Sequence, residues 1–250
     1  MDHAYNIGTY EVTNAQYVDF LNAKGASNTN GIYNSNMADY GIAQTGSSGS
    51  YTYSVTSGLE NRPVVYVSWY DAARFTNWLG NGQGSGDMET GAYTLSGNTG
   101  IIYVNTGATI YIPSETEWYK AAYYNGSTST YSLQANGQNW ISTADANYSR
   151  DGSTNVGSFG VPSFYGTFDQ AGNVWEWNDD FSYPNARGMK GGAWNSPNPD
   201  YLASTNGTYC TVPSERPDLG FRVASIPEPT SVVLTILGSC LLYTSPSPRD

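Results

Sequence analysis

The chain has 250 residues, of which 39% are apolar and only 12% are charged. This composition describes a loop-rich globular protein with a real core and excludes a disordered chain. The formal net charge of −11 excludes binding to nucleic acid, because that binding needs clustered Lys and Arg to displace counterions from the phosphate backbone.

Three helices are predicted from one N-terminal signature. In this signature a hydroxyl side chain caps the first turn, and a polar residue three positions later bonds back to the cap. After each signature, apolar residues recur at helical spacing, so we expect each helix to pack by one face. The signature pairs are Thr13 with Gln16, Ser68 with Asp71, and Ser114 with Glu117.

Short strands are predicted between clusters of Gly, Asn and Ser, which favour turns. The expected strands are residues 64–67, 101–104 and 110–112, with the last two forming a hairpin. Residues 24–60 are rich in Gly, Ser and Asn and alternate in character around Tyr53. This stretch predicts a long surface excursion that carries one strand.

Cysteine and histidine are scarce, which limits the available chemistry. Cys210 and Cys240 provide neither a disulfide framework nor a C-x-x-C site, and Cys210 is expected to be an inert, part-buried thiol. His3 is the sole histidine, which excludes a His-rich iron or zinc site and a Ser-His-Asp or Cys-His catalytic set built from this chain.

The end of the chain differs from the rest, so we expect one domain over residues 1–224 and a separate tail over 225–250. Pro227, Glu228 and Pro229 precede an apolar run at 231–242, which is too short to span a membrane, since spanning needs about 20 residues. The segment resembles a truncated PEP-CTERM sorting tail, which implies an exported protein of the cell envelope or the extracellular space, held at the membrane only through this tail. The start lacks a signal peptide, so we expect the sequence to begin inside a longer gene, and residues 244–250 to be foreign.

Six motifs occur along the domain in a fixed order. They are YEVTN at 10–14, RPVVYVSWYDA at 62–72, IPSETEWYKA at 112–121, GNVWEW at 172–177, KGGAW at 190–194 and GFR at 220–222. Together they resemble the formylglycine-generating enzyme, or sulfatase-modifying factor, family of bacteria and other organisms over residues 6–224. The resemblance implies a loop-rich α+β fold comparable with C-type lectins, with about three helices and several short antiparallel strands.

The resemblance also implies calcium, which binds 6 to 8 oxygen ligands from carboxylates, amides, carbonyls and water. The matching positions are Asp169, the Ala171 carbonyl, Gly172 and Asn173 in one loop, and Asn147, the Tyr148 carbonyl and Asp151 in a second. Because Asp and Asn also cap turns without any metal, the alternative that they only shape loops stays open.

The tryptophans of the late motifs divide into core and cleft. Each Trp buries about 150 to 250 Å², so we expect Trp177 and Trp194 to be core. Trp175 is expected to line the family's cleft. Arg222 is expected to be a buried guanidinium that ties loops together through several donors. The cleft would also contain Asn195, Ser196 and Asp200.

The family's oxidase chemistry uses a pair of cysteine thiolates, the soft ligands that bind copper. Aligned on Gly191 and Gly192, this chain has Ser196 and Tyr201 at those positions, so no copper is expected. We therefore expect a non-catalytic binding or structural module of an exported envelope protein, with a peptide or glycan ligand. Two alternatives stay open: an enzyme of the same family with altered chemistry, and a carbohydrate-binding surface protein, which the lectin-like architecture and the 22 tyrosines favour.

Overall fold

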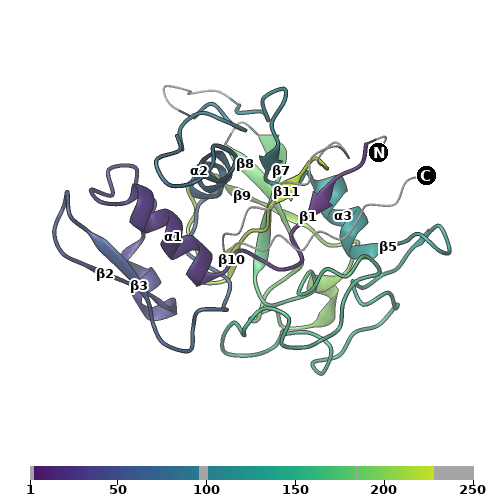
Figure 1. Ribbon diagram of the computed structural model, residues 1–250. Coiled ribbons are helices and arrows are strands. Elements are labelled where there is room, and N and C mark those ends of the chain that lie inside the picture. Colours follow the sequence, from purple (N-terminus) through teal and green to yellow (C-terminus); the bar gives the residue numbers. More distant parts are fainter. Residues whose placement is uncertain (1–2, 96–100, 184, 228–250) are drawn as a thin grey trace.

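The computed structural model describes residues 3–95, 101–183 and 185–227 and shows an α+β fold with much ordered loop (Figure 1). These residues contain three α-helices, α1 (Asn14–Lys24), α2 (Trp69–Gly80) and α3 (Glu115–Tyr123). Each begins directly after its predicted hydroxyl residue and forms the full reciprocal capping box. The helix prediction is confirmed, because these bonds satisfy backbone N–H groups that no helical carbonyl can reach.

The central sheet has the strand order β10-β7-β8-β9. Antiparallel pairing joins β7 (Trp175–Tyr183) to β8 (Ala186–Lys190) and β8 to β9 (Thr208–Thr211), whereas β10 (Leu219–Gly220) runs parallel to β7. The sequence analysis did not identify β7, the longest strand of the described residues.

Three smaller sheets lie around this centre in the described part of the chain. The first joins β1 (Asn6–Ile7), β11 (Ala224–Ser225) and β4 (Ile110–Tyr111), so both ends of the domain enter one sheet. The other two are the hairpins β2 (Ile42–Thr45) with β3 (Thr52–Val55), and β5 (Tyr124–Asn125) with β6 (Thr130–Tyr131). Short 3-10 helices, η1 (Ser35–Tyr40) and η2 (Pro199–Leu202), complete the regular structure.

The strand predictions are confirmed in part. The strand expected around Tyr53 is β3, and 110–111 form β4, but β4 pairs with β11 and not with residues 101–104. Residues 64–67 and 101–104 are not strands. The run at 64–67 is interrupted at Tyr66, because its φ of 57° lies in the left-handed region. The N–H of Tyr66 donates to the Arg216 carbonyl. In the second run, the carbonyl of Ile102 accepts from Arg187 instead of from a neighbouring strand.

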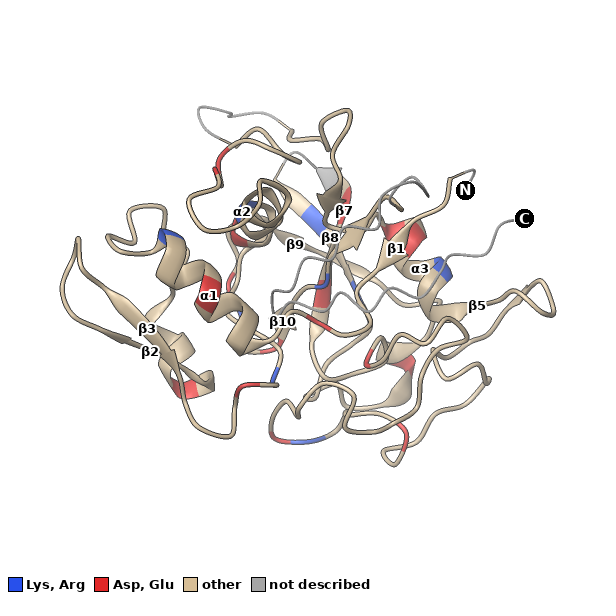
Figure 2. Ribbon diagram, in the orientation of Figure 1, with Lys and Arg blue, Asp and Glu red and all other residues tan. Residues whose placement is uncertain are grey.

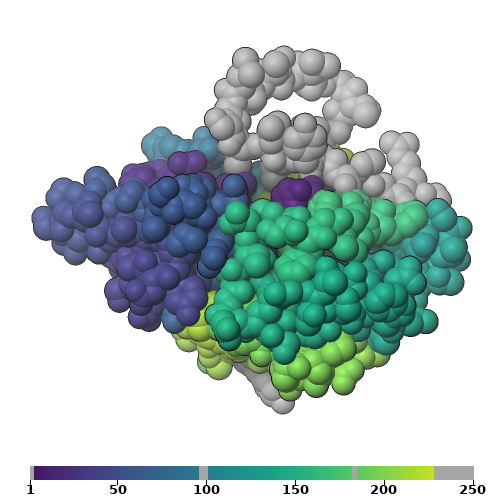
Figure 3. All heavy atoms as spheres, turned by 90° about the horizontal axis from the view of Figure 1, so that it is seen from below, coloured from purple at the N-terminus to yellow at the C-terminus, as the bar shows by residue number. Residues whose placement is uncertain are grey.

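The main core lies between α1, α2 and the central sheet. Phe20 of α1 packs edge-on against Phe75 of α2, and Phe75 packs in the same way against Phe221. A second cluster under α3 contains Trp118, Tyr123 and Leu202. In the space-filling view, the N-terminal part in purple and blue and the middle of the chain in teal and green form one continuous surface (Figure 3).

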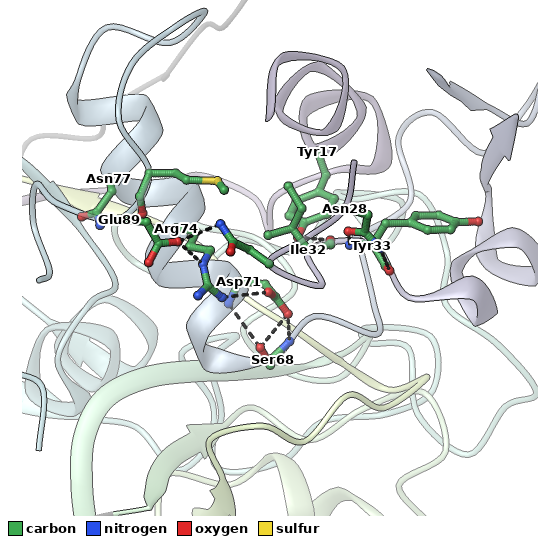
Figure 4. A network of polar contacts seen from close by, with 11 residues as sticks. Tyr17, Asn28, Ile32, Tyr33, Ser68, Asp71, Arg74, Asn77 and Glu89 are labelled. Carbon is green, nitrogen blue, oxygen red and sulfur yellow. Dashed lines mark hydrogen bonds and ion pairs between the residues drawn. The ribbon is translucent and has the colours of Figure 1, made fainter. Parts of the chain in front are cut away.

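A polar network fixes the first turn of α2 (Figure 4). The hydroxyl and the N–H of Ser68 both donate to Asp71 Oδ2, at 2.6 and 2.9 Å. Arg74 lies one turn on, with Nη1 3.7 Å from Asp71 Oδ1 and Nε donating to Glu89 at 2.7 Å. The helix start is therefore tied to the loop that follows the helix.

Except for residues 225–227, the segment expected to be a sorting tail lies outside the described residues. Within the described residues, no helix has both the length and the apolar character needed to cross a membrane.

Candidate functional site

Three segments that carry predicted site residues lie side by side in the structure. The N–H of Gly172 donates to the Gly191 carbonyl at 2.8 Å, and the N–H of Trp194 donates to the Asn173 carbonyl at 2.9 Å. The N–H of Asn173 donates to the Asn147 carbonyl at 2.8 Å. The two loops that the sequence predicted as separate calcium sites are therefore in direct contact.

Close approach of these backbones explains the glycine at position 172. Gly172 has a φ of 85°, and a Cβ there would lie 2.3 Å from the Asn147 carbonyl oxygen. Only glycine combines this backbone conformation with this contact.

The fully buried side chain of Asn173 connects the loops to the start of the chain. Its Oδ1 accepts from the Thr154 N–H at 2.9 Å and from Asn147 Nδ2 at 3.1 Å, and its Nδ2 donates to Glu11 Oε1 at 2.9 Å. Buried polar atoms need such partners. The amide oxygen predicted to bind calcium is thus already an acceptor of hydrogen bonds.

Arg222 is buried with no exposed surface, as predicted. It donates to both oxygens of Glu176, to the Gly8 carbonyl at 2.8 Å and to the Phe168 carbonyl at 2.9 Å. Its five N–H donors therefore tie the first strand, the calcium-predicted loop and β7 together.

Two further carboxylates lie within electrostatic reach of this ion pair. Burial raises the pKa of Glu11 well above its usual range, and the charges of Asp169 and Glu176 raise it further, against the opposing effect of Arg222. Burial raises the pKa of Asp169 to about 6, although the Gly157 N–H and Arg222 act in the opposite direction. Three carboxyl groups thus surround one guanidinium, and burial favours the neutral forms of Glu11 and Asp169.

Two buried oxygen atoms near this cluster, Glu11 Oε2 and Asn147 Oδ1, have no hydrogen-bond donor among the described residues. Carboxylate and amide oxygens are the ligand type that calcium takes, so the chemistry of the set fits that ion. Asp151, predicted for the second calcium loop, is exposed. No group of three or more His, Cys, Asp or Glu side chains in the described ranges is arranged to hold a metal ion, and the predicted ligands differ from such a group because they include amides and carbonyls.

Sequence reasoning did not assign Glu11 to this site. Its neighbours in the YEVTN motif gave only a helix start, and its contact with Asn173 spans 162 positions along the chain. The available signal was a single acidic residue beside Val12, in a segment that is otherwise buried.

The predicted cleft residues separate into two groups. Trp175 is 6% exposed and belongs to the main core beside Trp177. The expectation that it lines a surface cleft is therefore wrong. Asn195 and Asp200 are exposed. Trp194, expected in the core, is only half-buried, and its Nε1 donates to the Pro217 carbonyl at 3.4 Å.

Ser196 and Tyr201, which take the positions of the family's thiol pair, both border Gly192, but Ser196 does so with its hydroxyl and Tyr201 with its backbone carbonyl. A Cβ on Gly192 would lie 3.2 Å from Ser196 Oγ and 3.1 Å from the Tyr201 carbonyl oxygen. Ser196 is 3% exposed, and its Oγ accepts from the Ala193 N–H at 2.9 Å, whereas the Tyr201 side chain is 41% exposed. Cys210 lies half-buried on β9, as predicted for a part-buried thiol.

A polar cluster beside Asn195 was missed. Asn195 Nδ2 donates to Asp218 at 3.1 Å, and Arg216 donates to both oxygens of the same carboxylate at 2.8 and 2.6 Å. The Arg-Pro-Asp sequence at 216–218, one residue before the GFR motif, was the available signal. This cluster neutralises the charge of Asp218, which is 3% exposed.

The described fold has relatives among solved structures. It is similar to the crystal structure of CarF, with a TM-score of 0.62 and 22% identity over 90% of this chain and 87% of that one. It is also similar to Treponema denticola variable protein 1, with a TM-score of 0.60 and 24% identity over 89% of this chain and 84% of that one. At these identities the likeness concerns the fold alone.

Among curated sequences, the chain is 27% identical over 181 residues to the serine/threonine-protein kinase pkn1 of Chlamydia pneumoniae, which covers 72% of this chain. The chain spans 23% to 32% of the length of the curated relatives it matches. A family model described as sulfatase-modifying factor enzyme 1-like domain matches residues 1–226. Since that match covers nearly the whole chain and contains all six motifs, the chain belongs to the sulfatase-modifying factor enzyme 1-like domain family.

Proposed function

We propose that this sulfatase-modifying-factor-like domain is a non-catalytic binding or structural module of an exported, envelope-associated protein. The observation that supports the proposal is the identity of the two residues at the aligned thiol positions. Ser196 and Tyr201 replace the thiols, and neither oxygen is the soft ligand that holds Cu(I). Ser196 Oγ is moreover held by the Ala193 N–H inside a tight turn.

The test is a turnover assay with copper, oxygen and cysteine-containing peptides. The purified chain is expected to oxidise the peptide thiol no faster than the same mixture without protein. Copper-dependent conversion of the peptide above that background would refute the non-catalytic assignment.

Calcium is part of the same proposal. The buried oxygens Glu11 Oε2 and Asn147 Oδ1, together with Asp169, would hold the ion. An ion that binds only the folded state stabilises it by mass action. Melting curves with calcium and with chelator test this: an upward shift that Glu11→Gln abolishes supports it, and coincident curves refute it.

An enzyme with altered chemistry is the second candidate. It is favoured by the cluster of Asn195, Asp218 and Arg216, because Asn195 directly precedes Ser196, one of the two aligned thiol positions. A substrate screen in which activity is lost in Asp218→Asn, while the fold is kept, would favour this candidate over the non-catalytic one.

Export is proposed from the sorting-tail resemblance of residues 225–250. Fractionation of cells that carry the complete gene tests it, with recovery in the envelope or the medium expected and recovery only in the cytosol contradicting it.

A further inference from the structure

A polar pocket of about 160 Å³ lies on the central sheet beside the start of α3. It shares no lining residue with the Ser196 and Asp218 region. Residues from α3, β7, β8 and β9 line it, including Glu115, Asn178, Met189, Lys190, Thr208 and Tyr209. This volume equals about five water molecules, because each water occupies about 30 Å³ of liquid, so the pocket suits a small ligand.

Two glycines allow polar side chains to form the wall of this pocket. A Cβ on Gly188 would lie 2.3 Å from Asn178 Oδ1, and a Cβ on Gly207 would lie 2.8 Å from Lys190 Nζ. Larger residues at either position would displace these polar groups. The arrangement of Asn178 and Lys190 is therefore built into the sheet.

Asn178 supplies a hydrogen-bond donor that the protein leaves unused. The residue is 1% exposed, and its Oδ1 accepts from the Asp180 N–H at 3.2 Å. Its Nδ2 has no hydrogen-bond acceptor in the part of the chain that the structure describes. A ligand oxygen at this atom would supply the acceptor that the described residues do not.

The charges in the pocket cancel. Lys190 is 5% exposed, and its Nζ lies 3.1 Å from Glu115 Oε1 and donates to the Asn206 carbonyl at 3.0 Å. Figure 2 shows basic segments on β8 beside acidic segments on β7 and α3. With its ammonium neutralised in a chain of net charge −11, the pocket favours an uncharged polar ligand over an anion.

The rim provides an aromatic surface. Tyr209 is 47% exposed, and Thr208 precedes it on the edge strand β9. An uncharged sugar ring combines hydroxyls, which both donate and accept, with a C–H face that packs on an aromatic ring. That combination matches the unpaired amide, the carboxylate and the tyrosine of this pocket.

We propose that this pocket binds one uncharged hexose unit of a glycan, with Asn178 Nδ2 and the Glu115 carboxylate bonded to its hydroxyls and Tyr209 against its C–H face. The proposal goes beyond the non-catalytic assignment above and does not depend on it. Peptide oxidation by the Ser196 region would leave sugar binding untouched, and failure of sugar binding would leave the oxidation result unchanged.

In the test, the full chain is titrated with the methyl glycosides of glucose, galactose and mannose, and saturation-transfer NMR measures the binding. Saturable binding of at least one glycoside is expected, with a dissociation constant on the order of 1 mM, typical of a small polar ligand. Asn178→Leu keeps the side-chain size but removes the donor, and Tyr209→Ala removes the ring. Each is expected to weaken binding at least about tenfold, the ratio that corresponds to one lost hydrogen bond or ring contact.

Trp140→Ala is the matched control, because Trp140 is an aromatic residue with 64% exposure that does not line the pocket. It is expected to leave binding unchanged. If Asn178→Leu does not fold, Tyr209→Ala decides alone, since an exposed side chain can be truncated without loss of the core. The proposal is overturned by no saturable binding of any of the three glycosides, by equal binding in Tyr209→Ala and the wild type, or by tighter binding of glucuronate than of methyl glucoside.

Discussion

The Arg222 guanidinium donates to both carboxylate oxygens of Glu176 at 2.6 Å, and neither side chain has any exposed surface. Trp118 Nε1 donates to the same carboxylate at 2.6 Å. Because Glu176 lies on β7, Arg222 after β10 and Trp118 on α3, this pair fixes three elements that are far apart in the sequence.

Glu176→Gln should strongly destabilise the fold. The change leaves a buried guanidinium without its counter-charge, and breaking a buried pair in this way costs about 3–5 kcal/mol. The free energy of unfolding from urea titration measures the loss. Arg150→Lys, at an exposed arginine, is the control and should change it by less than about 0.5 kcal/mol. A loss below about 1 kcal/mol in Glu176→Gln would contradict the role of the pair.

Ser68→Ala should cost more stability than Thr13→Ala, although both remove a helix cap. The Ser68 hydroxyl donates to the buried carboxyl group of Asp71 at 2.6 Å (Figure 4). The Thr13 hydroxyl accepts from the backbone N–H of Gln16 at 3.4 Å. We expect about 1 kcal/mol for Thr13→Ala and about 2 kcal/mol for Ser68→Ala, because Ser68→Ala also removes a hydrogen bond to a buried carboxyl group. Equal losses in urea titrations of the two variants would show that Asp71 does not add to the cap.

The protein should be more stable at pH 5 than at pH 8. Burial raises the pKa values of Asp71 and Asp179 to about 7, while unfolded aspartate titrates near pH 4. The folded state therefore holds protons that the unfolded chain releases in this window. The contribution of these two groups to the free energy of unfolding is complete below about pH 4 and is lost as pH rises through 7. We expect the melting temperature to fall by about 3 °C or more from pH 5 to pH 8.

Asp179→Asn should reduce this pH dependence, whereas Asp39→Asn, at an exposed position, should leave it unchanged. A melting temperature that rises from pH 5 to pH 8 in the wild type would reverse the sign and refute the argument.

The double variant Ser196→Cys and Tyr201→Cys should acquire Cu(I) binding. Both positions align with the family's thiol pair on the Gly-Gly motif, and two thiolates supply the soft ligands that the wild type lacks. Competition with a chromogenic Cu(I) chelator measures the gain. Each single variant is the control and should bind much more weakly, because one thiolate does not form the pair. A double variant that competes no better than the singles would show that the two side chains do not converge.

Gly172→Ala should destabilise the fold far more than Gly137→Ala. Both glycines have φ near 80°, so both variants carry similar backbone strain of about 1 kcal/mol. Only position 172 adds a contact, since a Cβ there meets the Asn147 carbonyl at 2.3 Å, whereas nothing lies within 4 Å at 137. We expect a further loss of at least about 1–3 kcal/mol for Gly172→Ala in thermal unfolding. Equal losses would mean that the loops can separate without cost.

The helices could be predicted because their determinants are local. Each capping box connects residues three apart, and the bonds at Ser68 and Ser114 occur as the sequence indicates. The strand β7 could not be predicted in the same way. Its WEWNDDF sequence contains three acidic residues in a largely buried strand. Two of them, Glu176 and Asp179, pair with Arg222 and Arg187 from other parts of the chain.

The candidate site shows the same limit. Asn147 and Asn173 were identified from the family motifs, but their mutual contact and the contact with Glu11 depend on distant chain segments. Trp175 was expected at the cleft that the family resemblance implies. The parallel pairing of β10 with β7 instead places Trp175 in the core.

The pairing of β1 with β11 sets Asn6 opposite Ser225 and Ile7 opposite Ala224. A polypeptide that enters the domain at one of these strands therefore leaves it at the adjacent strand, so the two connections lie side by side. Such an arrangement permits insertion into a loop of a host protein, or attachment to a larger assembly, without long connectors and without redirecting the path of the host.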